Sequence, residues 1–247
     1  MAAKMPARSR MVRVWLFDFD LTLAALRYVV DWKGARRELE ALLRSAGAPA
    51  DLFAQVRAGA LPLYEAYRSR FGAEHEMVVN RASEIIEEFE LAGVDRAAPL
   101  EGATEALAAL LQSGARIAIV TSNSSKTIER WLGSHNLGDR VNAIVGRDTM
   151  LALKPSPAMV ERALALLTAL PADASFVGDS EDDFRAATAT GLRFIGIASE
   201  PGARDRLLAA GATEVFASPS ALAIHLNLDA TGRSVERKEH NARTVGR

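Results

Sequence analysis

The chain has 247 residues, of which 49% are hydrophobic and 25% charged, and its formal net charge is −1. These are ordinary values for a globular protein, and the length suits one large domain or a core with a smaller insert. The near-zero net charge gives no overall attraction to nucleic acid or to an acidic membrane. The chain has no cysteine, which excludes disulfides, thiolate metal sites and thiol nucleophiles.

The ends of the chain carry no sign of a membrane or secretion segment. No apolar run approaches the roughly 20 residues that a membrane helix needs. The basic start, "MAAKMPARSRM", lacks the apolar stretch of a secretory signal. We therefore expect a cytoplasmic protein with no membrane partner. Residues 1–11 and the polar stretch 229–247 are expected to be disordered.

The first predicted element is a strand over residues 12–19, a run rich in β-branched and aromatic side chains. The segment from about 26 to 91 has no strong strand run and is punctuated by Gly and Pro. Its pattern predicts helices over 31–47, 49–59, 61–72 and 74–93. Because this segment interrupts the chain after the first strand, we expect a helical cap domain, residues 25–95, above the edge of a sheet.

Beyond residue 100, short apolar runs alternate with helical patterns. The predicted strands are 116–120, 141–145, 174–178, 193–198 and 213–216. The helices between them include one capped by Ser124 and one with Ser156 as N-cap and Pro157 at its first position. Continuous apolar strands that alternate with helices predict an α/β fold, a doubly wound parallel sheet covered on both faces. This core would comprise residues 12–24 and 96–228.

Polar side chains follow several of these strands. Asp18 and Asp20 are two apart at the end of the first strand, so both carboxylates can reach one crevice. Two charges this close need a counter-charge or a shared proton. Three further groups occupy corresponding places: Thr121, Ser122 and Asn123; Lys154, which we place at the opening of a helix; and Asp179, Ser180, Asp182 and Asp183. Singly, each could be a turn, a surface lysine or a helix cap, but four in this order favour one site beyond the strand ends.

The four groups resemble the motifs of the haloacid dehalogenase-like hydrolase superfamily, namely "DFDLT", "VTSN", "KPSP" and "GDSEDD". The resemblance covers residues 12–226. The place of the helical segment is similar to the C1 cap of the phosphoglycolate phosphatase-like branch. Leu21 departs from the pattern, because many members have Gly there, and leucine leaves this turn less free to adopt a positive φ.

The resemblance implies roles for the acidic residues. Asp18 would be the nucleophile that forms an aspartyl-phosphate, and Asp20 the general acid and then the base. An aspartate at position 20 argues against a dehalogenase, which needs no proton for its leaving group. Mg²⁺ would be held by Asp18, the backbone carbonyl of Asp20 and Asp179, an oxygen-only set that suits this ion.

The resemblance also assigns the neighbouring polar residues. The Thr121 hydroxyl and the Ser122 N–H, within the group that ends at Asn123, would bind phosphoryl oxygens. Lys154 would supply a fixed positive charge to the nucleophile and the phosphoryl group. The remaining expectations are that Thr22 orients this region by hydrogen bonding, that Asp183 orients Lys154 or metal-bound water, and that Asp182 caps a helix.

The function implied is a Mg²⁺-dependent phosphatase acting on a small phosphorylated metabolite, with phosphoglycolate or a sugar phosphate as candidates. Two alternatives stay open, a phosphotransferase or mutase of the same fold and a catalytically idle binding module. The "EDD" after "DS" disfavours a mutase, and the complete set of motif side chains disfavours an idle module. We expect no nucleic-acid partner, and a monomer or homodimer. The substrate would be chosen by the cap, where the candidates after the first motif are Arg27, Tyr28, Trp32, Arg36 and Arg37.

Overall fold

The computed structural model describes residues 14–225. Its centre is a sheet of parallel strands in the order β3-β2-β1-β4-β5-β6. Their bounds are β1 Val14–Phe17, β2 Arg116–Val120, β3 Ala143–Val145, β4 Ala174–Gly178, β5 Arg193–Ile197 and β6 Val215–Phe216. Phe17, the last residue of β1, lies opposite Ile119 of β2 and Val177 of β4. The carboxyl ends of these three strands therefore lie together at one edge, and the predicted doubly wound α/β fold is confirmed.

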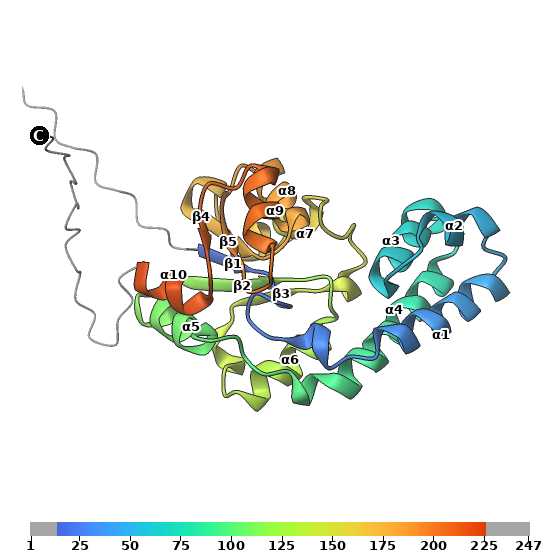
Figure 1. Ribbon diagram of the computed structural model, residues 1–247, viewed down its shortest axis with the longest axis horizontal. Coiled ribbons are helices and arrows are strands. Elements are labelled where there is room, and N and C mark those ends of the chain that lie inside the picture. The colour runs from blue at the N-terminus through green and yellow to red at the C-terminus, as the bar shows by residue number, and fades with distance from the viewer. Residues whose placement is uncertain (1–13, 226–247) are drawn as a thin grey trace, which may run out of the picture.

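Helices cover both faces of the sheet (Figure 1). One face carries α5 (Ala103–Gln112), α6 (Ser125–Ser134) and α10 (Pro219–His225), and the other carries α7 (Ala158–Leu166), α8 (Glu181–Ala189) and α9 (Ala203–Ala210). Side chains of β1 alternate between the two layers, with Trp15 and Phe17 in one apolar cluster and Val14 and Leu16 in the other. Both sets are buried, which explains why the strand reads as an unbroken apolar run.

Four helices lie between β1 and α5 and extend beside the sheet rather than over a face of it (Figure 1). They are α1 (Trp32–Ser45), α2 (Ala50–Gln55), α3 (Ala60–Phe71) and α4 (Glu76–Gly93). We call these four helices the cap. Asp31 begins α1 by accepting a hydrogen bond from the Gly34 N–H. The division into a cap domain of residues 25–95, with the core on either side of it in the chain, stays a prediction.

Five short 3₁₀ segments complete the described elements: η1 Leu26–Tyr28, η2 Val94–Arg96, η3 Gly138–Arg140, η4 Arg147–Thr149 and η5 Pro171–Asp173. The first two join the cap to the core on either side. The fourth lies just after β3, in the stretch that leads to Lys154. Only η1 and η4 follow strands, β1 and β3, on the carboxyl side of the sheet, whereas η3 and η5 precede β3 and β4.

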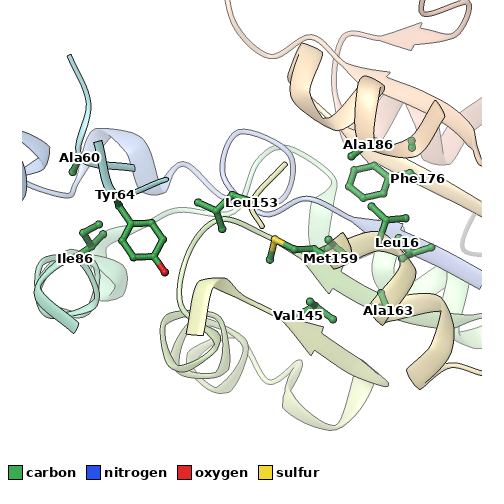
Figure 2. Close-up of a cluster of buried hydrophobic side chains, with 14 of the residues drawn as sticks. Leu16, Ala60, Tyr64, Ile86, Val145, Leu153, Met159, Ala163, Phe176 and Ala186 are labelled. Carbon is green, nitrogen blue, oxygen red and sulfur yellow. The ribbon is translucent and has the colours of Figure 1, made fainter. Parts of the chain in front are cut away.

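One apolar cluster runs without interruption from the sheet into the cap (Figure 2). Leu16 and Phe176 lie at its sheet end, and Tyr64 and Ile86 at its cap end. Leu153 lies between them, in the loop that follows η4. The cap therefore packs on the core through buried side chains as well as through its two connections.

Of the two helix starts predicted at Ser124 and at Ser156, one is confirmed and one is wrong. Ser124 caps α6 as predicted, with its hydroxyl accepting a hydrogen bond from the Thr127 N–H. The predicted helix positions of Ser156 and Pro157 are wrong by one residue, because Pro157 is the N-cap and α7 begins at Ala158. Lys154 consequently lies in a loop rather than at the opening of a helix. The predicted disorder of residues 1–11 and 229–247 lies outside the described residues.

Between residues 14 and 225, the structure has no helix that is both long enough and apolar enough to cross a membrane.

The central position of β1 predicts a large cost for truncating its side chains. Leu16 is fully buried, so Leu16→Ala should lower the free energy of unfolding by about 2–5 kcal/mol. Leu170 is 64% exposed, and Leu170→Ala should change the free energy of unfolding by less than about 0.5 kcal/mol. Denaturant unfolding of both variants checks this, and equal effects would contradict the burial order.

Candidate active site

An ion-pair cluster joins four segments at the carboxyl edge of the sheet. Asp18 directly follows β1, and its N–H donates to the Val177 carbonyl of β4. Lys154 Nζ lies 2.5 Å from Asp18 Oδ1 and 2.5 Å from Asp183 Oδ1, and it also donates to the Val120 carbonyl at 3.0 Å. Asp183, expected to orient Lys154, is thus its direct partner. The lysine connects the ends of β1 and β2 to the start of α8.

The same place gathers the oxygen atoms that a metal ion would need. Asp18, Asp179 and Asp183 each offer a carboxylate oxygen, and the three oxygens lie within 4.8 Å of one another. Asp20 is not in this group, and its side chain instead accepts a hydrogen bond from the Arg27 N–H at 2.8 Å. Oxygen-only donors suit a hard divalent cation such as Mg²⁺. The residues therefore fit the expected ion, with Asp20 able to take part through its backbone alone.

The charges of this cluster are costly without a cation. Burial raises the pKa of Asp18 from 3.8 to about 7, against the lowering effect of Lys154 and together with the repulsion of Asp183. Burial, and then the charges of Asp18 and Asp183, raise the pKa of Asp179 well above its usual value. Burial alone would lower the pKa of Lys154, but its two carboxylate partners outweigh this and raise it, so the lysine stays charged.

Asp20 lies in a tight turn after β1. Burial raises the pKa of its carboxyl from 3.8 to about 6, although the Arg27 N–H and the Arg27 charge oppose this. Leu21 has a φ of 61°, despite the expectation that leucine would resist this conformation. The turn is held because the Leu21 N–H donates to the Ala24 carbonyl and the Ser199 hydroxyl donates to the Leu21 carbonyl. A carboxyl with a pKa near 6 suits both acid and base catalysis near neutral pH.

The expected role of Thr22 has no support from its contacts. Thr22 is fully buried in this turn, and its hydroxyl has no hydrogen-bond partner within residues 14–225. Its N–H donates to the Phe19 carbonyl, as do the N–H groups of Leu23 and Ala24. The backbone, rather than the threonine hydroxyl, therefore holds the turn that presents Asp20.

Residues 121–124, which we call the β2 loop, follow β2 at the same edge. The Thr121 hydroxyl donates to Asn123 Oδ1 at 3.0 Å and accepts from the Asn123 N–H at 3.2 Å. Both side chains are almost fully buried, whereas Ser122 is half-buried. To donate to a phosphoryl oxygen, the Thr121 hydroxyl would have to turn its proton away from Asn123. The loop nonetheless lies where the sequence predicted, beside Lys154.

A cleft of about 880 Å³ opens above these groups. The core lines it with the acidic cluster, Lys154 and the β2 loop, and also with Arg27, Arg185 and Arg206. Helix α3 of the cap lines it with Leu61, Pro62, Glu65, Ala66 and Ser69. Arg27 is the one expected cap-side candidate found among these lining residues. Trp32 instead donates to the Arg27 carbonyl, and Arg36 donates to the carbonyls of Val56 and Gly59.

The model of the haloacid dehalogenase-like hydrolase family matches residues 15–197. The chain belongs to this family. It is 31% identical to phosphoglycolate phosphatase 1 of Pseudomonas aeruginosa over 194 residues, which cover 75% of this chain and 69% of that protein. It is 36% identical to the phosphoglycolate phosphatase of Pectobacterium atrosepticum, over 38% of this chain and only 40% of that protein. These relatives confirm the resemblance to the phosphoglycolate phosphatase-like branch.

The fold agrees with solved structures of such proteins. The crystal structure of CbbY from Rhodobacter sphaeroides in complex with phosphate has a TM-score of 0.61 with this chain. The two chains are 22% identical in sequence, and their alignment covers 86% of this chain and 96% of the CbbY chain. The likeness supports the arrangement of sheet and cap, and the family membership makes the chain a hydrolase.

One prediction about the fourth motif of this hydrolase is wrong. Asp182 was expected to cap a helix, but Ser180 is the N-cap of α8, and Asp183 completes a reciprocal capping box with it. Asp183 Oδ2 accepts from the Ser180 N–H and hydroxyl while Oδ1 faces Lys154. Asp182 lies in the first turn and pairs with Arg185 at 3.4 Å. Asp183 thus takes part in the capping box and contacts the lysine, because its position three after Ser180 allows both.

Two sets of residues near the cleft could not be predicted from the motifs. The first is the α3 wall, whose residues form a helical pattern that does not indicate which side faces a ligand. The second is a fully buried ion pair between Glu90 of α4 and Arg147 of η4. One signal was available for the second set, because Arg147 follows β3 just as the motif residues follow their strands.

The raised pKa of Asp18 predicts a pH-dependent gain of stability on its removal. A carboxyl that binds a proton more tightly when folded makes the folded state less stable as pH rises from about 4 to about 7. With a chelator present, Asp18→Asn should therefore gain free energy of unfolding over the parent protein as pH rises through this window, by on the order of 1 kcal/mol. Denaturant unfolding at pH 4.5 and 7.5 checks this. If the difference in free energy of unfolding between the variant and the parent protein stays constant with pH, the charge of Asp18 does not destabilise the folded state.

Proposed function

We propose that this hydrolase is a Mg²⁺-dependent phosphatase that cleaves a small phosphate monoester through an aspartyl-phosphate on Asp18. The observation that carries the proposal is the Lys154 ammonium group, 2.5 Å from both Asp18 and Asp183, with the Asp179 carboxylate beside them. A lysine that is buried and charged by its partners supplies a fixed positive charge where a phosphoryl group would sit. The acidic residues around it leave a place for a divalent cation.

The first half of the reaction is assigned to Asp18 and Asp20. An oxygen of the Asp18 carboxylate attacks phosphorus, and the bond between phosphorus and the ester oxygen breaks. Asp20, with a pKa of about 6, gives its proton to the departing oxygen, so that an alcohol leaves. Mg²⁺, held by Asp18, Asp179 and the Asp20 carbonyl, would offset negative charge on the phosphoryl oxygens.

The second half returns the enzyme to its starting state. Asp20 is now a carboxylate, and it takes a proton from a water that attacks phosphorus. The bond between phosphorus and the Asp18 oxygen then breaks, which frees phosphate and restores the Asp18 carboxylate. The Ser122 N–H and the Thr121 hydroxyl bind phosphoryl oxygens in both halves, and Lys154 holds the Asp18 side chain in place through Oδ1.

The substrate is a small phosphorylated metabolite, in this proposal phosphoglycolate or a sugar phosphate. Two relatives by sequence bear the name phosphoglycolate phosphatase, which supports the first candidate. The wall opposite the acidic cluster comes from α3, where Glu65 is already paired with Arg68 at 2.6 Å. A panel of phosphorylated metabolites would identify the substrate, and activation by a bisphosphate would favour the alternative of a mutase.

Replacing the nucleophile tests the proposal directly. Asp18→Asn keeps the shape of the side chain but not its nucleophilic charge, so Mg²⁺-dependent hydrolysis of p-nitrophenyl phosphate should fall by at least about 10³-fold. Circular dichroism should remain that of the parent protein. Asp182→Asn is the matched control, since Asp182 also lines the cleft but forms its ion pair with Arg185 and not with the acidic cluster or Lys154, and its rate should stay within about twofold.

Two results would contradict this assignment. One is near-normal turnover by Asp18→Asn, and the other is turnover by the parent protein that a chelator leaves unchanged. Parent protein with no turnover on any phosphate monoester would favour the idle binding module.

The acid role of Asp20 predicts a dependence on the leaving group. Asp20→Asn cannot donate the proton, so hydrolysis of an alkyl phosphate should fall about 10²- to 10⁴-fold. Formation of the phosphoenzyme from p-nitrophenyl phosphate should fall much less, because p-nitrophenolate leaves without a proton. Rapid-quench measurement of the first turnover with both substrates separates the steps. Equal losses for the two substrates would argue that Asp20 does not act as the acid.

A further inference from the structure

We propose that Glu90 of the cap and Arg147 of the core are positioning residues that together hold the β2 loop in its phosphate-binding conformation. The inference rests on the proposed function, since it assigns the β2 loop to phosphate binding. It adds two residues that lie outside the four motifs and do not line the cleft. It also gives the cap a part in the chemistry of the core besides that of a wall.

The first observation is the position of Arg147. Its side chain is fully buried, and its Nη1 donates to Glu90 Oε1 at 2.8 Å and to the Ser122 carbonyl at 2.8 Å. Nη2 donates to Glu90 Oε2, and Nε donates to the Ser83 hydroxyl of the same cap helix at 3.1 Å. The backbone N–H of Arg147 donates to the Asn123 carbonyl at 2.8 Å. One residue thus holds two consecutive carbonyls of the β2 loop.

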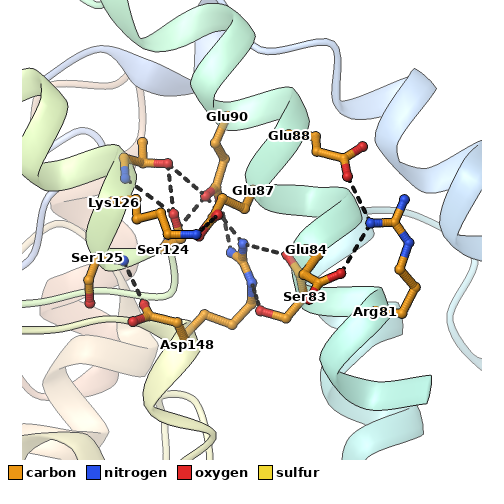
Figure 3. A network of polar contacts seen from close by, with 12 residues as sticks. Arg81, Ser83, Glu84, Glu87, Glu88, Glu90, Ser124, Ser125, Lys126 and Asp148 are labelled. Carbon is orange, nitrogen blue, oxygen red and sulfur yellow. Dashed lines mark hydrogen bonds and ion pairs between the residues drawn. The ribbon is translucent and has the colours of Figure 1, made fainter. Parts of the chain in front are cut away.

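The second observation is what else Glu90 accepts. Its Oε1 accepts from Asn123 Nδ2 at 2.9 Å, and its Oε2 accepts from the Ser124 N–H at 3.0 Å and the Thr127 hydroxyl at 3.2 Å. Figure 3 shows Glu90 reaching from α4 toward Ser124 at the start of α6. The Glu90 side chain is fully buried, like that of Arg147. The carboxylate therefore contacts the side chain, the backbone and the following helix of the β2 loop at once.

These contacts determine the direction of the polar groups near the cleft. An ionised carboxylate only accepts hydrogen bonds, so the amide NH₂ of Asn123 must face Glu90. The Asn123 oxygen then faces Thr121, whose hydroxyl donates to it. Arg147 fixes the Ser122 carbonyl and so the peptide plane that follows the Ser122 N–H. Ser122, whose N–H is one proposed phosphate ligand, is therefore held through its carbonyl. The Thr121 oxygen is held through Asn123, and only its proton has to turn when phosphate binds.

Stability alone does not account for the pair. A buried ion pair is costly to desolvate, and an apolar pair of similar volume is often as stable. Two exposed pairs, Glu87 with Lys126 and Asp95 with Arg130, already join the cap and its second connection to α6. Neither exposed pair contacts the β2 loop in the described structure. The buried pair differs from them in the residues it orients.

The experiment uses Glu90→Gln, which keeps the volume but lets the amide offer a donor where the carboxylate only accepted. Asn123 and Arg147 then lose their fixed orientation. We expect KM for p-nitrophenyl phosphate and the inhibition constant of inorganic phosphate each to rise about 10- to 100-fold. The Mg²⁺ concentration for half activation should not change, because Asp18 and Asp179 contact neither Glu90 nor Arg147. Glu87→Gln, on the same helix, should change none of the three.

A second variant guards against loss of folding. Glu90→Leu combined with Arg147→Met replaces the pair by apolar side chains, and its cooperative unfolding shows whether it folds. We expect it to show the same weakening toward phosphate. The rise in Tm caused by inorganic phosphate reports this without turnover, so the test holds even if the proposed activity fails. Absence of turnover by the parent protein would refute the proposed function alone.

Three results would overturn the inference. The first is unchanged KM and phosphate inhibition in Glu90→Gln, whatever happens to its Tm. The second is a parallel loss of Mg²⁺ and phosphate affinity, which would indicate general loosening rather than misplacement of the β2 loop. The third is full phosphate affinity in the folded double variant, which would show that apolar packing at this place suffices.

Discussion

The site depends on one buried ammonium group. Lys154 Nζ has two carboxylates at 2.5 Å and a strand-end carbonyl at 3.0 Å, and these partners come from three different segments of the chain. Without it, Asp18, Asp179 and Asp183 would crowd like charges into a buried place, which is unfavourable even with the lysine, as the raised pKa values of Asp18 and Asp179 indicate. This cost supports the proposed reaction, because the charges of the cluster suit a cation and a phosphoryl group more than they suit one another.

The parallel sheet brings these partners together. β1 is central and pairs in register with β2 and β4, so that Asp18 emerges between the β2 loop and the start of α8. Lys154 arrives from the loop after β3, two positions away in the sheet. Residues 136 positions apart in the chain meet because every strand points the same way and each loop returns to the same edge.

Much of this arrangement could be predicted from the sequence, and the failures have physical causes. Strands buried on both faces leave continuous apolar runs, and polar residues after them stand out, which is why Asp18, Lys154 and Asp179 could be found. Asp182 and Asp183 have the same local pattern, so only three-dimensional geometry shows that Asp183 both bonds back to the N-cap Ser180 and faces Lys154. Leu21 adopts its positive φ because distant Ser199 and the turn backbone hold it, a context that no propensity contains.

The contacts between cap and core were the least predictable, and they change how the cap is understood. A helical pattern indicates that Glu90 lies among apolar neighbours but does not show that Arg147 will meet it 57 residues later. The buried pair holds the carboxyl-terminal half of α4 to the core, and the apolar cluster through Tyr64 and Leu153 holds α3 to it. Substrate choice and phosphate binding would thus reside in different helices of the same cap, with α3 contacting the variable part of the substrate and α4 holding the loop that binds its phosphate.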